Sequence, residues 1–130
     1  MTSIGSHCVL ELYDSPMSLL DDPQAVIEAL HQAAKAARAT LLQTTHHRFT
    51  PHGITALALL AESHISVHTW PERGYAACDV FTCGPQTLPE AACMALVEAF
   101  ECPRYFMRRF PRGERVSAPV LCLRTGTDPV

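Results

Sequence analysis

The sequence predicts an α+β fold: a two-layer sandwich in which an antiparallel sheet carries two helices packed on one face. Segments with the composition of strands outnumber segments with helical periodicity. A short turn at 71–74, rather than a long crossover, joins the middle segments, so neighbouring strands are expected to run antiparallel. Only two segments repeat apolar residues at helical spacing, enough to cover one side of such a sheet. We expect residues 1–130 to form a single domain.

The first part of the chain predicts a strand, a helix and a second strand. Residues 5–13 alternate in polarity, which is typical of a half-buried strand, and Glu11 points away from the leucines. Asp22 and the proline after it supply the N-cap and first turn of a helix at 23–38, where apolar residues recur at helical spacing. Residues 39–49 are rich in β-branched and aromatic side chains and predict the second strand.

The middle of the chain predicts three consecutive strands. Residues 54–62 are short and continuously apolar, which favours a central buried strand. Residues 65–70 contain isoleucine, valine, threonine and tryptophan, the composition of a strand. The turn at 71–74 then reverses the chain into a hairpin partner at 75–82.

The last part predicts a second helix followed by late strands. Thr87 and Glu90 have the spacing of a capping box, and the apolar stripe after them ends before Pro103. Residues 105–110 carry adjacent arginines and predict an exposed edge strand. Residues 116–123 predict a further strand, and the tail after them is expected to be loose.

Composition narrows the class of protein. The length suits one domain but a small pocket, so oligomerisation is expected. The net charge is −3 and the nine arginines are scattered, so no nucleic-acid partner is expected. Neither a signal peptide nor a membrane span is recognisable, which predicts a cytoplasmic protein with no membrane partner.

Metal and disulfide chemistry are not favoured. The six cysteines include no C-x-x-C pair, and we expect most of them to be reduced, small apolar residues. Five histidines lie close in sequence: His46, His47, His52, His64 and His68. On a strand, the last two share a face but stand ~13 Å apart, too far to bind one ion. We therefore expect no metal.

Residues 61–84 concentrate the reactive side chains and suggest a self-made cofactor. Ser63 follows Glu62, and a serine on a strained peptide bond can attack the preceding carbonyl. The resulting ester can eliminate and hydrolyse to a pyruvoyl group, a ketone that forms a Schiff base with a substrate amine. Pyridoxal phosphate needs a lysine, and the only lysine, Lys35, lies within a predicted helix with no motif around it. This favours an internally generated carbonyl.

Three motifs carry a resemblance to a known family. They are Glu62-Ser63-His64, the sequence HTWPE at 68–72, and DVFTCG at 79–84. With a match at 47–53 and a weaker one toward the N-terminus, they resemble the short prokaryotic S-adenosylmethionine decarboxylase proenzymes, over about the first hundred residues. The last thirty residues carry little of this pattern.

The resemblance implies self-cleavage between Glu62 and Ser63. Residues 1–62 would form a β chain and residues 63–130 an α chain that begins with a pyruvoyl group derived from Ser63. His68 matches the processing histidine, and Cys83 matches the proton donor of decarboxylation. Thr55 stands where the family has a serine that supports cleavage. The threonine keeps the hydroxyl but is stiffer at χ1, and we expect processing still to occur.

The resemblance also implies the substrate and its contacts. Phe49 and Glu72 match positions that hold the adenosyl part of S-adenosylmethionine, and Glu11 matches an acidic position near the sulfonium. Loss of carbon dioxide would give the aminopropyl donor for spermidine. Two alternatives stay open: a pyruvoyl-dependent arginine or ornithine decarboxylase of the same family, and an unprocessed regulatory subunit without catalysis.

Strand geometry suggests a homodimer with shared sites. On an extended strand, Ser63 and His68 stand ~16 Å apart and on opposite faces. We therefore expect each site to combine two subunits related by a two-fold axis. One subunit would contribute Ser63, Cys83 and Glu11, and the other Phe49, Thr55, His68 and Glu72.

Overall fold

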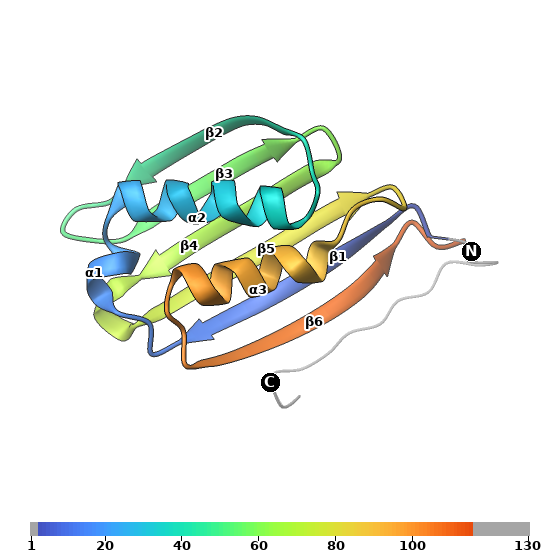
Figure 1. Cartoon of the computed structure of the whole chain (residues 1–130). Coiled ribbons are helices and arrows are strands. Elements are labelled where there is room, and N and C mark those ends of the chain that lie inside the picture. The colour runs from blue at the N-terminus through green and yellow to red at the C-terminus, as the bar shows by residue number, and fades with distance from the viewer. Residues whose placement is uncertain (1–2, 116–130) are drawn as a thin grey trace.

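One antiparallel sheet dominates the structure, a computed structural model that describes residues 3–115 (Figure 1). Its order is β2-β3-β4-β5-β1-β6, and every neighbouring pair is antiparallel. The strands are β1 (Gly5–Tyr13), β2 (Leu41–Arg48), β3 (Ile54–Leu60), β4 (Ser63–Trp70), β5 (Tyr75–Cys83) and β6 (Arg104–Arg112). The predicted strand at 116–123 and the tail after it lie outside the described residues.

Two long helices lie side by side across one face of this sheet, which confirms the predicted fold class (Figure 1). They are α2 (Pro23–Ala36) and α3 (Pro89–Ala99). A short helix, α1 (Met17–Leu20), and a 3-10 turn, η1 (Pro71–Arg73), lie at one end of the sheet. None of the helices in the described part is long and apolar enough to span a membrane.

The signals that start and stop α2 act as expected. The Asp22 side chain accepts a hydrogen bond of 3.0 Å from the Gln24 amide, so it caps the helix. The helix ends at Ala36, before the predicted residue 38, because Arg38 has a positive φ of 56°. The buried stripe of α2 packs on the sheet.

The predicted capping box of α3 is wrong. The helix begins at Pro89, one residue later than a capping box with Thr87 as N-cap requires. The actual N-cap, Leu88, makes no side-chain hydrogen bond. The Thr87 hydroxyl instead donates to the carbonyls of Cys83 and Gly84, at 3.4 and 3.1 Å. Thr87 therefore tightens the turn that leaves β5 rather than capping the helix.

The prediction that β3 is a buried strand holds for only one of its faces. Its side chains alternate between buried and partly exposed, and Leu57 and Leu59 are 42% and 50% exposed. The helices cover only one face of the sheet, so the apolar residues of β3 on the opposite, outward face remain uncovered. Continuous apolarity therefore marks a surface here, and not a doubly buried strand.

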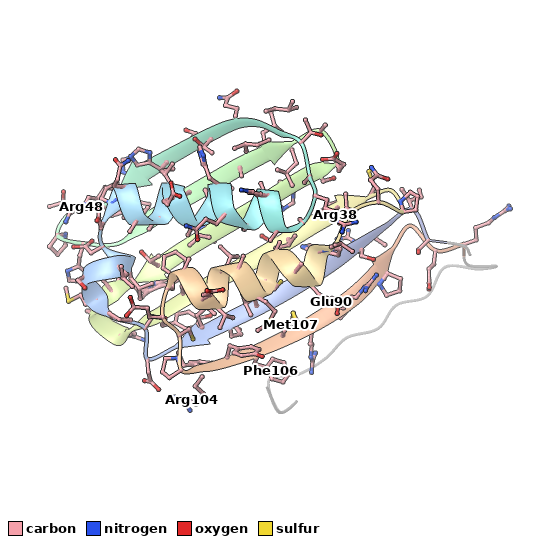
Figure 2. The ribbon with its side chains drawn as sticks, viewed as in Figure 1. Arg38, Arg48, Glu90, Arg104, Phe106 and Met107 are labelled. Carbon is pink, nitrogen blue, oxygen red and sulfur yellow. The ribbon has the colours of Figure 1, made fainter. Side chains whose placement is uncertain are left out.

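Strand parity divides β1 cleanly. Cys8, Leu10 and Leu12 are fully buried under the helices, while Glu11 lies on the outward face, as expected. The predicted edge strand is β6, whose other side is unpaired in the described sheet. Figure 2 shows Arg104 and Phe106 of β6 along this edge.

Candidate functional site

Ser63 is the first residue of β4 and has an unusual backbone. Its φ is +141°, a conformation that side-chain-bearing residues rarely adopt. The turn Ala61–Glu62 joins β3 to β4 so tightly that Leu60 and Ser63 are paired across it. The structure thus holds strain next to the Glu62–Ser63 peptide bond, where the sequence predicted a cleavable one.

The peptide carbonyl of Glu62 points at a backbone donor. The Cys83 amide donates a hydrogen bond of 3.0 Å to the Glu62 carbonyl oxygen. A donor fixed in this position draws electrons from the carbonyl and stabilises negative charge that develops on its oxygen. This arrangement favours attack on the Glu62 carbonyl carbon.

The Glu62 side chain is anchored as well. Its two carboxylate oxygens accept hydrogen bonds from the Thr40 amide at 2.9 Å and the Thr40 hydroxyl at 3.2 Å. The Ala61 amide donates to the Thr40 carbonyl at 2.9 Å. The bond from the Thr40 amide holds the pKa of Glu62 below its usual value. Sequence analysis missed Thr40, since nothing in the pattern links positions so far apart.

A second group of predicted residues surrounds a cavity at the other end of β4. Phe49, Thr55, His68 and Glu72 line this cavity of about 400 Å³ together with Trp70. This volume lies within the range of small-molecule sites.

Within this cavity, the predicted side chains contact one another. Thr55 and His68 are paired across β3 and β4, and the Thr55 hydroxyl and the Nδ1 atom of His68 share a hydrogen bond of 3.0 Å. This bond leaves Nε2 of His68 directed away from Thr55, where it can exchange a proton. Phe49 is 48% exposed, and its ring contacts that of His47 with the centroids 4.6 Å apart.

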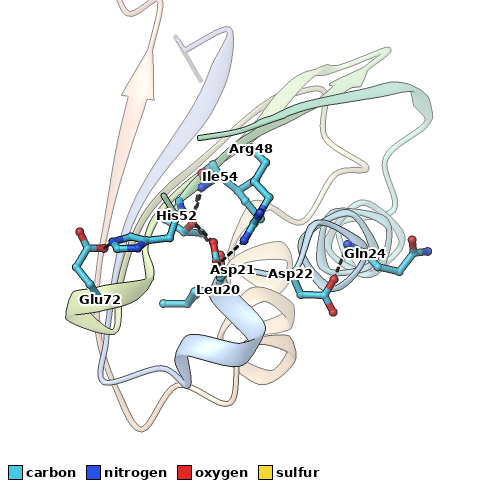
Figure 3. Close-up of polar contacts among 10 residues, drawn as sticks. Leu20, Asp21, Asp22, Gln24, Arg48, His52, Ile54 and Glu72 are labelled. Atoms are coloured by element: carbon cyan, nitrogen blue, oxygen red, sulfur yellow. Dashed lines mark hydrogen bonds and ion pairs between the residues drawn. The ribbon is translucent and has the colours of Figure 1, made fainter. Parts of the chain in front are cut away.

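Asp21 supports the loop that carries Phe49 (Figure 3). Its two oxygens accept hydrogen bonds from the Gly53 amide at 3.0 Å and from Arg48 at 2.9 Å. The Gly53 bond and the Arg48 guanidinium hold the pKa of Asp21 below its usual value. On the other side of the loop, His52 lies 3.4 Å from Glu72.

Glu11 lies nearer to the cavity residues than to the cleavage turn. Glu11 and His68 are both paired with Ala77, so Glu11 lies about 10 Å from His68, two strand spacings away. Cys83 is six residues along β5 from Ala77, about 20 Å away. The expected grouping of Glu11 with Ser63 and Cys83 is therefore wrong, because the register of β1 sets it opposite the other end of β5.

Glu11 also has a partner that sequence analysis missed. The Tyr75 hydroxyl donates a hydrogen bond to the Glu11 carboxylate. Burial and this bond to Glu11 raise the pKa of Tyr75. The tyrosine ring packs against Trp70, with ring centroids 5.4 Å apart, beside the cavity.

The two groups of residues are separated along β4. Ser63 and His68 belong to the same strand, about 16 Å apart. Strand parity gives them opposite faces, and Thr55, His68 and Cys83 share the outward face. Within one chain, the cleavage turn and the cavity therefore cannot act on the same ligand atom.

A third cluster, which sequence analysis also missed, lies on the outward face near the cleavage turn. Asp79 accepts a hydrogen bond from the Ser66 hydroxyl and lies 2.6 Å from Nε2 of His7 and 3.2 Å from Nε2 of His64. These side chains come from three neighbouring strands, β1, β5 and β4. The DVFTCG motif contained Asp79, but its partners depend on strand register.

Comparisons with known proteins agree with this geometry. The family model described as S-adenosylmethionine decarboxylase matches residues 6–113. A protein of Synechococcus sp. (strain WH7803), named S-adenosylmethionine decarboxylase proenzyme, is 55% identical over 109 residues, 84% of this chain and 85% of its own length. A protein of the same name from Methanococcus vannielii is 52% identical over 90 residues, 69% of this chain and 74% of its own length.

A solved structure shares the fold. The crystal structure of the adenosylmethionine decarboxylase from Aquifex aeolicus VF5 superposes with a TM-score of 0.81 at 33% identity, covering 93% of this chain and 100% of the other. From the matched residues, the identities and the shared sheet, we conclude that the chain belongs to the S-adenosylmethionine decarboxylase family.

Proposed function

We propose that this chain is a self-cleaving S-adenosylmethionine decarboxylase. It is made as a precursor that breaks between Glu62 and Ser63 into a β chain, 1–62, and an α chain, 63–130. Ser63 becomes a pyruvoyl group at the start of the α chain. The observation that carries this proposal is the strained Ser63 backbone next to a carbonyl that accepts the Cys83 amide.

Cleavage begins with Ser63. Its Oγ attacks the Glu62 carbonyl carbon, the peptide C–N bond breaks, and the released nitrogen takes a proton. The Cys83 amide stabilises the charge that forms on the carbonyl oxygen. A base then removes the Cα proton of residue 63, the Cβ–Oγ bond breaks, and Glu62 leaves as a carboxylate. Water converts the remaining enamine to a ketone and releases ammonia.

The base for this elimination comes from a second copy of the chain. His68 has the acid–base chemistry required near neutral pH but lies about 16 Å from its own Ser63 along β4. A homodimer in which the cleavage turn of each subunit lies against the cavity of the other, about a two-fold axis, brings Ser63 and Cys83 of one subunit to that cavity. The exposed Leu57 and Leu59 supply apolar surface for this contact. The dimer thereby completes two identical sites.

The cavity side chains suit a nucleoside joined to a cation. The Phe49 face can stack on adenine, and the Glu72 carboxylate can accept hydrogen bonds from ribose hydroxyls. Glu11 supplies negative charge about 10 Å from His68, suited to the sulfonium. The relatives from Synechococcus and Methanococcus carry the name of this decarboxylase, so an arginine or ornithine substrate and an unprocessed regulatory role are not favoured.

The residues of this chain bind the substrate and return a proton to it, while the new carbonyl supplies an electron sink. A pyruvoyl ketone takes up the substrate amine and stabilises the electrons left when carbon dioxide departs. The thiol of Cys83 holds the proton that is returned to that carbon. The product is the aminopropyl donor for spermidine. We place the enzyme in the cytoplasm, without nucleic-acid partners, as the composition predicts.

Mass spectrometry of the denatured protein tests this proposal. We expect two fragments that divide at 62/63, the larger one lacking an N-terminal amine. Substrate with cyanoborohydride should add covalently to the larger fragment and not to the smaller. S-adenosylmethionine should release carbon dioxide faster than arginine or ornithine. An intact 130-residue chain that decarboxylates at full speed would overturn the proposal.

A further inference from the structure

The Asp79 cluster lies where self-cleavage would create a new chain end. Asp79 is directly opposite Ser66 in the β4–β5 register, and His64 and His7 are diagonal to it on β4 and β1. Its carboxylate therefore links two alternate residues of β4, His64 and Ser66, to β5, and through His7 to β1. After cleavage these become the second and fourth residues of the α chain.

Cleavage changes what holds this end of β4. In the precursor, the turn Ala61–Glu62 ties β4 covalently to β3. Once the bond at 62/63 is broken, that tie is lost, and new chain ends open more easily than continuous turns. Contacts besides the backbone hydrogen bonds of the sheet are then needed to hold residues 63 and 64 in place. The side-chain bonds of Asp79 to His64 and Ser66 can supply them.

The cluster is electrostatically suited to this task. Asp79 is 25% exposed, and although burial opposes its ionisation, bonds from Ser66, His7 and His64 hold its pKa below the usual value. It is therefore ionised near neutral pH and accepts strong, charge-assisted hydrogen bonds. Arg112 in turn donates a hydrogen bond of 2.7 Å to Nδ1 of His7.

The same atoms could reach a metal ion, but the hydrogen bonding favours another role. The three candidate ligand atoms, on His7, His64 and Asp79, lie within 4.8 Å of one another. Because Arg112 donates to Nδ1 of His7, the hydrogen of a neutral imidazole lies on Nε2 and is directed at Asp79. That nitrogen then has no lone pair for a metal.

We propose that Asp79 is a positioning residue that holds the N-terminal end of the α chain, and with it the group made from Ser63, in register for decarboxylation. It acts through His64 and Ser66 and does not touch the reacting atoms. The proposal rests on the self-cleavage proposed above, and it assigns Asp79 a task that begins only after the chain has been cut.

Hydrogen exchange in cut and uncut protein tests this role. Asp79→Asn is introduced into the wild-type chain and into the uncleavable Ser63→Ala chain, and exchange is followed in a peptide from 64–70 by mass spectrometry. In the cut protein we expect exchange to rise about tenfold, the effect of losing a buried hydrogen bond or two. In the uncut protein we expect a change of less than about twofold, because the turn holds the strand.

Kinetics provide a second readout. In cleaved Asp79→Asn enzyme, kcat should fall about tenfold while KM changes less than about twofold, since Asp79 does not line the substrate cavity. His64→Ala removes one tie without touching Asp79 and should give a smaller change of the same pattern, so it carries the test if Asp79→Asn does not fold. Glu90→Gln, on the helix side beside Arg109, is the matched control and should change neither readout.

The outcomes separate the two proposals. A wild-type chain that never divides at 62/63 overturns the proposed function itself. A wild-type chain that divides, with equal exchange increases in cut and uncut Asp79→Asn, overturns the positioning role and shows general stabilisation of the sheet. Exchange and kcat that stay unchanged in both Asp79→Asn and His64→Ala would also overturn the positioning role. A rise in the kcat of the wild-type enzyme on adding zinc or iron, absent in Asp79→Asn, would replace the positioning role with a metal site.

Discussion

The two ends of β4 are built from different interactions. At the Ser63 end, a strained residue and the Glu62 carbonyl are held chiefly by the backbone, through the amide of Cys83. At the His68 end, side chains such as Thr55 and Phe49 line a cavity. Backbone contacts survive most substitutions, whereas side-chain contacts do not. Bond breaking should therefore tolerate mutation at the Ser63 end better than substrate binding does at the His68 end, except at Ser63 itself and at His68 and Thr55, which supply its base.

The test with the largest expected effect co-expresses two variant chains, one altered at each end of β4. Ser63→Ala and His68→Ala should each abolish cleavage when expressed alone, because each homodimer lacks a required group at both sites. Co-expression should restore cleavage of about half of the His68→Ala chains, since random pairing puts half of them with a Ser63→Ala partner. Intact-mass analysis of tagged chains measures the yield. No cleavage in the mixture would mean that both ends act within one chain.

Cys83→Ala separates a backbone role from a side-chain role at a single residue. The alanine keeps the amide that binds the Glu62 carbonyl, so cleavage should continue at near the wild-type rate. It removes the thiol, so decarboxylation by the cleaved enzyme should slow by about 10²- to 10⁴-fold, the usual value of a general acid. Fragment appearance and carbon dioxide release measure the two steps. Equal loss of both would show that the thiol also serves cleavage.

Thr55→Val tests the hydrogen bond that orients His68. Valine keeps the shape of threonine but cannot bond Nδ1 of His68, so cleavage should slow about tenfold. Thr55→Ser is the matched control: it keeps the hydroxyl and should cleave at least as fast as wild type. The rate is followed by the appearance of the 63–130 fragment. A valine variant that matches the serine variant would exclude the bond from the mechanism.

Asp21→Asn should give the smallest effect, on stability. The folded-state pKa of Asp21 is lowered, so its contribution is full above its unfolded pKa of about 4 and is lost as pH falls through the lower folded value. The gap in urea midpoint between wild type and variant should therefore be largest near pH 7 and shrink below about pH 4. Glu28→Gln, on an exposed turn of α2, is the control. A gap that widens in acid would contradict this sign.

Much of the fold was predictable because it depends on local patterns. Alternation in β1 predicted which side chains face the helices, and the Asp22 cap predicted where α2 begins. Burial of β3 was mispredicted because its composition cannot tell whether one or both faces of the sheet are covered. The Thr87 cap was mispredicted because its hydroxyl binds the turn behind it.

The site was predictable as a set of residues but not as an arrangement. The motif at 61–84 contained Ser63 and Cys83, and the family resemblance supplied their expected roles. The torsion of Ser63 and the bonds of Glu62 to Thr40 required the structure, because they depend on packing between distant segments. Glu11 was assigned to the wrong end because register, and not composition, sets its neighbours.

The hydrogen bond from Cys83 to Glu62 has a consequence for the order of events during synthesis. The donor lies at the far end of β5, so a growing polypeptide cannot complete the geometry of its breakable bond until residue 83 has left the ribosome and the hairpin has formed. If a second copy must also supply His68, maturation waits further, for an encounter between finished molecules. Assembly would then act as the checkpoint that licenses the precursor to become an enzyme.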